Sequence, residues 1–541
     1  MRLDRGNSRL PGLLAVLATI AWSSAQAGPD GTATDKDFVL PPVPEAAPFG
    51  SHAGPGALVT AIEFTGNSAI PTPELDAIAA PFLGRPLRVV DIEELRQRVS
   101  RRYVERGYVN SGAVIPADAY RDGVLRVQLI EGRISEVRLR GMAGLDDAYV
   151  ITRLGNGGAL NVNVLQERIR LLLADPLFER INARLAPGRD LGDAVAEIDV
   201  TRAPAFHAQV FANNYLAPSL GSGLLGVNGV LRNATGWGDA LDATAQSNGH
   251  ADHYDVGWTA PLFAGRTTLE LRATSGASVV LEQPFDQLNI RSKVDSRQVM
   301  VSHPLVAGSR RQFSLAAGFS QRRSRTTLDG EPFSFTPGEV DGKTTVRDWS
   351  FSQDYVERFD RHVLAVRSTF VWGRNTLAGS SLPGEPPRRY RIWVGQAQTQ
   401  STLADTGTQL VLRGNLQRTA DRLVPLERLG IGGRYTVRGY RENQLVRDQG
   451  YVVNAEIVHP LRRDNGDGSQ LAIVPFLDLG RGANRDEPAE CLAAVGIGLQ
   501  GRWHGFEAEL FMAKRLKTPS PDSHGNLQDH GIHLQVRYAL L

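Results

Sequence analysis

Cysteine is almost absent from this chain of 541 residues, since Cys491 is the single one. One cysteine cannot form an intramolecular disulfide, and it cannot build a zinc site from several thiolates. An excess of one charge is also lacking, because 60 Lys and Arg balance 58 Asp and Glu and leave a formal net charge of +2. A chain this close to neutral offers no broad basic surface. We therefore expect no nucleic-acid partner.

Catalytic signatures are missing as well. The sequence contains no His-Glu-x-x-His and no Gly-x-Ser-x-Gly, and its eleven histidines show no ligand spacing. The segment 338–344 resembles a phosphate-binding loop but is one residue short of the required spacing, so it is interpreted as an ordinary connection. We expect no catalytic residue, no cofactor, no metal site and no enzymatic activity.

Long hydrophobic runs are absent beyond the N-terminus, so no stretch is suited to a transmembrane helix. The first nine residues carry three arginines, Leu10 to Trp22 is mostly apolar, and Ala25-Gln26-Ala27 offers small residues for cleavage. This order predicts a secretory signal peptide over 1–27. An exported chain without a membrane helix is either water-soluble or a membrane β-barrel.

Residues 28–57 are rich in Pro and Gly, which predicts an extended linker. This segment has two interpretations: it serves as a docking peptide, or it is only a tether.

Two α/β units of similar order follow, over 58–132 and 133–205. In the first, alternation, helical spacing and turn residues predict a strand, two helices and two strands, at 58–65, 73–82, 91–106, 112–116 and 124–131. Asp91 is expected to cap the second helix. In the second unit the same order recurs, at 134–140, 145–154, 162–174, 180–185 and 194–201. Such a repeat indicates a tandem array.

From Phe206 to Leu541 the period of the sequence changes to two. Segments of about ten residues alternate apolar with polar or small residues between turn residues, which is typical of a membrane barrel. Sixteen such strands are predicted, beginning near 206, 224, 240, 253, 267, 296, 312, 346, 363, 391, 409, 451, 471, 493, 506 and 531. The fold class is thus α+β repeats followed by a 16-stranded antiparallel β-barrel.

The alternation also assigns faces, most clearly over 450–461 and 471–480. Val453 and its apolar neighbours would face lipid, whereas Asn454 and Asp478 would face the lumen. In a water-soluble sandwich the apolar face would instead be the core. On the barrel interpretation, Asn454→Leu should be tolerated and Val453→Arg should not.

Two stretches of the first unit carry a family resemblance. The run Tyr-Val-Glu-Arg-Gly-Tyr-Val-Asn-Ser from 103 to 111, with the strand Gly-Val-Leu-Arg-Val-Gln-Leu-Ile-Glu-Gly from 123 to 132, resembles the POTRA domain of TpsB-type transporters, the outer-membrane transporters of two-partner secretion systems. The residues in question are Tyr103, Gly107, Tyr108, Ser111, Glu131 and Gly132. We interpret them mainly as core and turn residues.

A long connection over 421–449 carries the second resemblance. Its core, 432–443, reads Gly-Gly-Arg-Tyr-Thr-Val-Arg-Gly-Tyr-Arg-Glu-Asn, and Ile431, Tyr435, Val437 and Tyr440 are expected to anchor it. Val437-Arg438-Gly439-Tyr440 is similar to the tip of the family's lumen-inserted loop. Phe476, Asp478 and Gly480 fit the family's Phe-x-Asp-x-Gly strand. The resemblance implies that Arg438 meets Asp478 inside the barrel. The alternative leaves Arg438 on a solvated surface loop.

The family resemblance implies a function. The chain would lie in the bacterial outer membrane, with its POTRA domains in the periplasm. It would capture a secreted exoprotein, a large β-helical client, and pass it unfolded to the cell surface. Periplasmic chaperones and the barrel-assembly machinery would act during its own biogenesis. Two alternatives stay open: a factor that inserts other barrels, and a passive porin or receptor.

Overall fold

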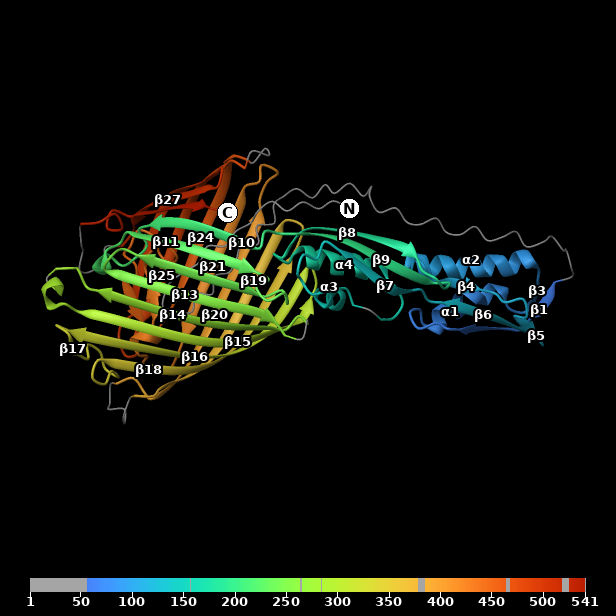
Figure 1. The fold of residues 1–541 in the computed structure, drawn as a ribbon, viewed down its shortest axis with the longest axis horizontal. Helices are drawn as coiled ribbons and strands as arrows, with labels where there is room; N and C mark the ends of the chain where they lie inside the picture. The colour runs from blue at the N-terminus through green and yellow to red at the C-terminus, as the bar shows by residue number, and fades with distance from the viewer. Residues whose placement is uncertain are drawn as a thin grey trace. The chain divides into compact units, whose positions relative to one another are not determined.

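The computed structural model describes residues 56–155, 157–262, 265–283, 285–377, 385–463, 468–517 and 525–540. Within this part of the chain two compact units separate, one ending at Ala203 and the other running from Pro204 (Figure 1). The expected signal peptide, and all but the last two residues of the expected linker, lie outside the described residues.

The first α/β domain packs two helices and short strands around one apolar core. Its elements are β1 (Ala57–Val59), β2 (Ala61–Thr65), α1 (Thr72–Ala79), η1 (Ala80–Phe82), β3 (Arg85–Leu87), α2 (Val89–Glu105), β4 (Gly112–Val114), β5 (Tyr120–Arg121) and β6 (Val124–Ile130). The main sheet has the order β2-β6-β4, and β2 runs parallel to β6.

The single strand predicted over 58–65 is wrong, because Thr60 divides it. The Thr60 backbone N–H and hydroxyl both donate to the Gly123 carbonyl, at 2.8 and 3.1 Å. This bend sends β1 to pair with β3 while β2 pairs with β6. Local alternation could not reveal the break, because the partner at Gly123 is sixty-three residues away.

Asp91 does not cap the helix in the way expected. Helix α2 begins two residues earlier, at Val89, and Asp91 stands at its third position. There its carboxylate accepts the Arg88 backbone N–H at 2.9 Å, as the acidic member of a capping box does.

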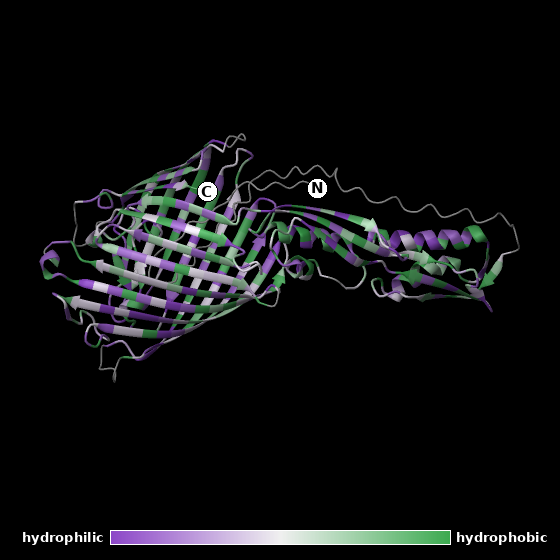
Figure 2. Ribbon diagram, viewed as in Figure 1, coloured by the Kyte–Doolittle hydropathy of each residue, from purple (hydrophilic) through white to green (hydrophobic). Residues whose placement is uncertain are grey.

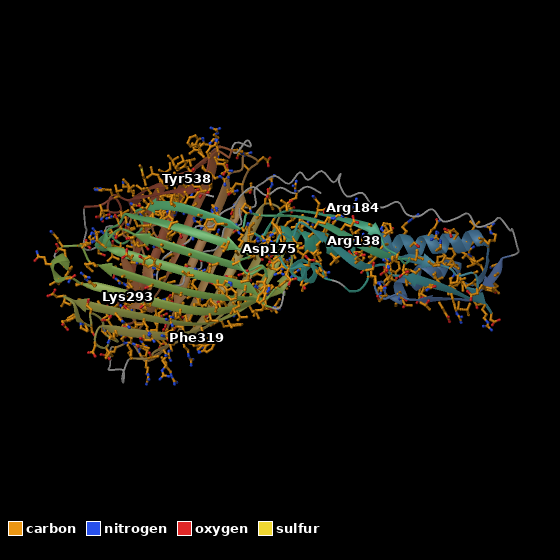
Figure 3. All side chains as sticks on the ribbon, in the orientation of Figure 1. Arg138, Asp175, Arg184, Lys293, Phe319 and Tyr538 are labelled. Carbon is orange, nitrogen blue, oxygen red and sulfur yellow. The ribbon has the colours of Figure 1, made fainter. Side chains whose placement is uncertain are left out.

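The second α/β domain repeats the plan with β7 (Arg133–Arg140), α3 (Asp147–Leu154), α4 (Val162–Leu173), β8 (Phe178–Pro187) and β9 (Asp193–Arg202). Its sheet has the order β7-β9-β8. Arg138 on β7 and Arg184 on β8, both labelled in Figure 3, pair with Glu197 of the central strand. Among the described residues, no helix is both long and apolar enough to cross a membrane.

The second unit is a closed antiparallel barrel whose first and last strands pair. Sixteen strands form its wall, and the two-residue β17 (Glu331–Pro332) adds a short hairpin to β16. The wall strands are β10 (Phe206–Asn213), β11 (Leu224–Arg232), β12 (Ala240–Ser247), β13 (Ala251–Pro261), β14 (Thr268–Val279), β15 (Arg291–Ala307), β16 (Arg311–Leu328), β18 (Lys343–Arg358), β19 (His362–Asn375), β20 (Arg389–Thr402), β21 (Gln409–Arg418), β24 (Gln449–Arg462), β25 (Gln470–Ala483), β26 (Glu490–Trp503), β27 (Phe506–Arg515) and β28 (Ile532–Ala539).

The sixteen-stranded barrel is therefore confirmed. The largest error in a strand start is at β15, which begins at Arg291 rather than near 296, because this long strand extends past its apolar part. Figure 2 shows polar and apolar residues alternating along the wall strands. Val453, Leu477 and Leu479 are exposed on the outer face, whereas Asn454 and Asp478 are buried inside.

The assignment of the two faces predicts how a charged substitution affects barrel assembly. Val453→Arg should impair barrel assembly, because an arginine on the lipid face costs about 2–4 kcal/mol near the bilayer midplane. Heat-modifiable migration of the membrane fraction measures the folded barrel. Gln396→Arg on β20 places the same side chain on an inward position and serves as the control. Equal loss of folded barrel in the two variants would contradict the assigned faces.

Candidate functional site

The connection between β21 and β24, residues 419–448, is the candidate site, and we call it the inserted loop. It contains η4 (Pro425–Glu427), β22 (Leu429–Ile431) and β23 (Leu445–Arg447). Its stem packs Leu423, Val424 and Leu426 against Val346, Tyr390 and Ile392 of the wall. The stem is thus fixed to β18 and β20 by apolar contact.

The rest of the loop packs on the inner face of the barrel. Strands β22 and β23 pair in antiparallel fashion. Gly432 and Gly433 follow β22 directly, and their φ values of +116° and +100° are accessible to glycine. Leu429, Ile431, Val437, Tyr440 and Leu445 are buried against Val452, Leu492 and Ala494. Tyr435 is not a buried anchor as expected. It is 45% exposed and stands edge-on to Tyr215 at 5.6 Å.

Arg438 is almost fully buried, at 1% exposure. Its Nε and Nη2 atoms donate to the two oxygens of Asp478, each at 2.7 Å, and its backbone N–H donates to Oδ2 at 3.0 Å. Asp478 is fully buried. The fork-on-fork geometry is the strongest arrangement open to these two groups.

The other residues of the Phe-x-Asp-x-Gly strand lie around this pair. The Phe476 ring lies 3.5 Å below the guanidinium carbon, which adds a cation–π contact. Gly480 leaves room for the loop, because a Cβ there would stand 2.5 Å from Ile431 Cγ2 and 2.7 Å from Val437 Cγ2. The spacing thus places a ring, an acid and a gap on one face of β25.

Sequence reasoning missed a second acid beside Arg438. Glu456 Oε1 accepts from Arg438 Nη1 at 2.7 Å, and Arg413 pairs with the other oxygen at 2.9 Å. The alternation of residues 450–461 already predicts that Glu456 faces inward. The strand register that places Glu456 opposite Phe476 is a tertiary feature.

Asn454 also belongs to the site, which changes an expectation. Its amide donates to Asp478 Oδ1 at 2.7 Å and to the Thr436 carbonyl. Leucine at 454 would remove both hydrogen bonds and leave Asp478 less well satisfied. The expectation that Asn454→Leu is tolerated as an ordinary lumen change does not fit this geometry.

Gly439 and Tyr440 complete the loop tip. Gly439 has φ of +88° and donates its N–H to His533 Nε2 at 3.1 Å. The Tyr440 hydroxyl donates to the carbonyls of Ala493 and Lys517, at 2.9 and 2.6 Å. Val437 and Arg438 therefore meet β25, whereas Gly439 meets β28 and Tyr440 meets β26.

Arg441, directly after this motif, forms a clasp that the sequence did not reveal. It donates to both oxygens of Asp529, at 2.6 and 2.8 Å, and to Glu282 at 2.5 Å. Asp529 lies in the connection after β27 and Glu282 in the connection after β14. Because wall strands alternate in direction, these connections and the inserted loop meet at the same end of the barrel.

The POTRA-type residues lie in the first α/β domain, and several of them hydrogen-bond to one another. Glu131 accepts from the backbone N–H groups of Ser68 and Ala69, both at 2.7 Å, and from the Tyr103 hydroxyl at 2.9 Å. Burial acts to raise the pKa of Glu131, but these hydrogen bonds hold it below its ordinary value. Burial, together with Glu131, raises the pKa of Tyr103.

The remaining residues of that set shape the turns. Tyr108 meets the Tyr103 ring edge-on at 6.0 Å, and Ser111 accepts the Gly132 N–H at 2.9 Å. Gly107 has φ of +90° and accepts the Val162 N–H at 2.9 Å. Among the described residues, no group of three or more His, Cys, Asp and Glu is placed to hold a metal ion.

Comparison with known families decides between the functions left open. The family model for haemolysin secretion/activation protein ShlB/FhaC/HecB matches residues 192–501. The chain belongs to this family. The model for the POTRA domain, ShlB-type, matches residues 57–132. This ShlB-type protein is therefore an outer-membrane transporter of the two-partner secretion class, with POTRA domains in the periplasm.

Curated relatives agree with the family. The ShlB-type chain is 22% identical over 441 residues to the outer membrane transporter CdiB of Escherichia coli, covering 78% of this chain and 71% of that protein. It is 23% identical over 499 residues to CdiB-2 of Burkholderia pseudomallei, covering 86% and 82%. A shorter match, 25% over 193 residues, is to the heme/hemopexin transporter protein HuxB of Haemophilus influenzae, covering 34% of each chain.

Solved structures share the fold. CdiB from Escherichia coli superposes with a TM-score of 0.72 at 21% identity, covering 92% of this chain and 93% of that one. BamA from Haemophilus ducreyi lacking POTRA domains 1–3 gives 0.53 at 12% identity, covering 90% and 100%. At these identities the likeness concerns the fold alone.

Proposed function

We propose that this transporter captures an unfolded exoprotein through its POTRA domains and passes it through the barrel lumen, with the inserted loop as a movable plug. The observation that carries the proposal is the buried Arg438–Asp478 pair, which joins a loop to the inner wall of a pore. Secretion by variants of these two residues tests it, as set out in the Discussion.

The pair suits a plug that moves. A charge-assisted hydrogen bond contributes about 1.5–3 kcal/mol, which favours one loop position without making it permanent. The stem, by contrast, rests on a buried apolar cluster. We infer that the stem stays on β18 and β20 while the tip, from β22 to β23, leaves the wall.

Client capture would use the edges of the POTRA sheets. Within the described residues, β2 has β6 as its only sheet partner, which leaves its other edge open to a further strand. An extended client segment pairs with such an edge through main-chain hydrogen bonds, so recognition tolerates varied sequences. The client class that we propose is a large β-helical exoprotein.

The other partners follow from the architecture. The outer face contacts outer-membrane lipid, and periplasmic chaperones and the barrel-assembly machinery would deliver and insert the barrel. The sequence shows no nucleotide-binding motif. We propose that folding of the client outside the cell drives its export.

Two other functions fit less well. A factor that inserts other barrels shares the fold, as BamA does, but the ShlB-type family model covers most of this barrel. A passive porin would need neither two periplasmic α/β domains nor a buried arginine on a lumen loop.

The Arg441 clasp should hold the outer mouth closed. Because β10 follows the periplasmic domains in the chain, the connections after β14, β21 and β27 are extracellular. Arg441→Ala should raise the fraction of time the pore is open by roughly tenfold or more, since a charge-assisted hydrogen bond is worth ~1.5–3 kcal/mol. Planar-bilayer conductance measures this. Arg310→Ala, an exposed change in the connection after β15, is the control. Unchanged gating in Arg441→Ala would show that the clasp does not close the mouth.

A further inference from the structure

An open space lies in the lumen between the inserted loop and one part of the wall. Tyr435 and Glu442 line it from the loop. The opposite side is the inner face of β28, β10, β11 and β12. It presents Arg537 at one edge and five side-chain amides: Gln209, Asn213, Asn228, Gln246 and Gln535. We call these five residues the amide strip.

The amide strip is continuous across the four strands. Gln209 stands opposite Asn228 in the β10–β11 register, and Asn213 stands opposite Gln535 across the β10–β28 closure. On β11, Asn228 pairs with Thr244, two positions from Gln246 on β12. The strip therefore forms one polar surface and is not a scatter of separate side chains.

Two of its members have unused hydrogen-bonding capacity. Gln209 and Gln246 are each only 9% exposed, and the described residues offer neither side chain a hydrogen-bond partner. Neither amide is among the buried polar atoms that lack a partner, so both reach the lumen space and can hydrogen-bond to what occupies it.

A primary amide matches a peptide group, because each presents one carbonyl acceptor and N–H donors. A wall of neutral amides can hydrogen-bond the backbone of any extended chain without selecting or retaining it by charge. A wall of guanidinium and carboxylate groups would hold charged side chains of the client strongly.

The wall beside the stem carries paired charges. The tip covers β24, β25 and β26. On β16 and β18, Arg322 bridges Asp348 at 3.0 Å and Glu427 of the stem at 2.6 Å, so that wall is charged and already occupied. We propose that the amide strip is the track along which the unfolded client passes, in contact with its backbone. This inference rests on the proposed function.

Site-specific photocrosslinking tests the track. A benzophenone side chain is placed at Gln209 or at Gln246, and Ser352, an inward and buried position on β18, carries it in the control. The client bears a stably folded C-terminal domain that arrests it in transit. We expect crosslinks to the arrested client to be several-fold stronger from the two glutamine positions, since the probe reacts only with groups in direct contact with it.

The outcomes separate the two proposals. Equal or stronger crosslinking from Ser352 would overturn the track and leave passage through the lumen standing. No crosslink from any of the three positions, with folded barrel and an arrested client both present, would overturn the track and the lumen route together.

A second measurement does not depend on the probe. The double change Gln209→Leu with Gln246→Leu should slow client secretion by about fivefold for each hydrogen bond lost. Gln209→Asn with Gln246→Asn, which keeps the amides, should retain most of the rate. If the leucine variant with normal folded barrel secretes at the normal rate, the amides hold only water and the track is wrong.

Discussion

Arg438→Ala should reduce client secretion by at least an order of magnitude while the barrel stays in the membrane. The change removes the guanidinium that donates to both Asp478 and Glu456, so these two carboxylates lose the positive charge that they share. Removing one partner of a buried ion pair costs about 3–5 kcal/mol, and here the cost falls on the closed position of the loop. The measurement is client in the medium, divided by folded barrel from heat-modifiable migration.

Asp478→Ala should give a loss of similar size, because it leaves the buried guanidinium with Glu456 alone. The double variant should lose clearly less than the two single losses combined, since the second change removes an interaction already broken. Strictly additive losses would show that the pair does not act together, and the plug model would fall.

Two further variants serve as controls for charge and geometry. Arg438→Lys keeps the charge but cannot make the bidentate contact with Asp478, so it should restore only part of the secretion. A charge exchange, Arg438→Asp with Asp478→Arg, should not restore it, because the new acid would lie close to Glu456. Full secretion by the lysine variant would mean that charge alone, without the fork geometry, holds the tip.

Deletion of residues 58–132 should abolish secretion and leave the barrel inserted. The contacts of the chain separate the periplasmic domains from the barrel as two compact units, so the barrel does not depend on the first POTRA-type domain for its core. Secretion is assayed as before, and planar-bilayer conductance shows whether a pore remains.

The deletion also removes two hydrogen-bond partners of the second domain, the carbonyls of Gly107 and Gly132, which accept from Val162 and Leu160. A matched control is therefore Tyr103→Phe, which keeps the domain and removes only the hydroxyl bonded to Glu131. Normal secretion by the deleted protein would contradict the capture role. Equal loss in Tyr103→Phe would show that the assay reports domain stability and not capture.

The periodicity of the sequence determined the barrel and its sixteen strands. Side chains alternate across a strand at every second residue, so the inward position of Asp478 and the outward position of Val453 follow from local order. The same reasoning failed at Thr60, because its partner Gly123 lies in another part of the domain.

The composition of the loop tip and of β25 suggested which residues meet. Arg438 is an arginine among apolar neighbours, and such a group needs an acid where water is scarce. The sequence could name Asp478, since its strand is strongly patterned. It could not name Glu456 or Asn454, because the β24–β25 register that sets them beside the pair is fixed by pairing along the whole strand.

Local order therefore determined the wall of this protein, and only the tertiary structure decided what the wall encloses. The Arg441 clasp joins connections that lie far apart in the chain, and Glu282 and Asp529 carry no periodic pattern that marks them. The amide strip spans both ends of the barrel sequence, because closure brings β28 beside β10. Barrel closure and the return of the inserted loop are long-range events, so the contacts that they create have no local signature.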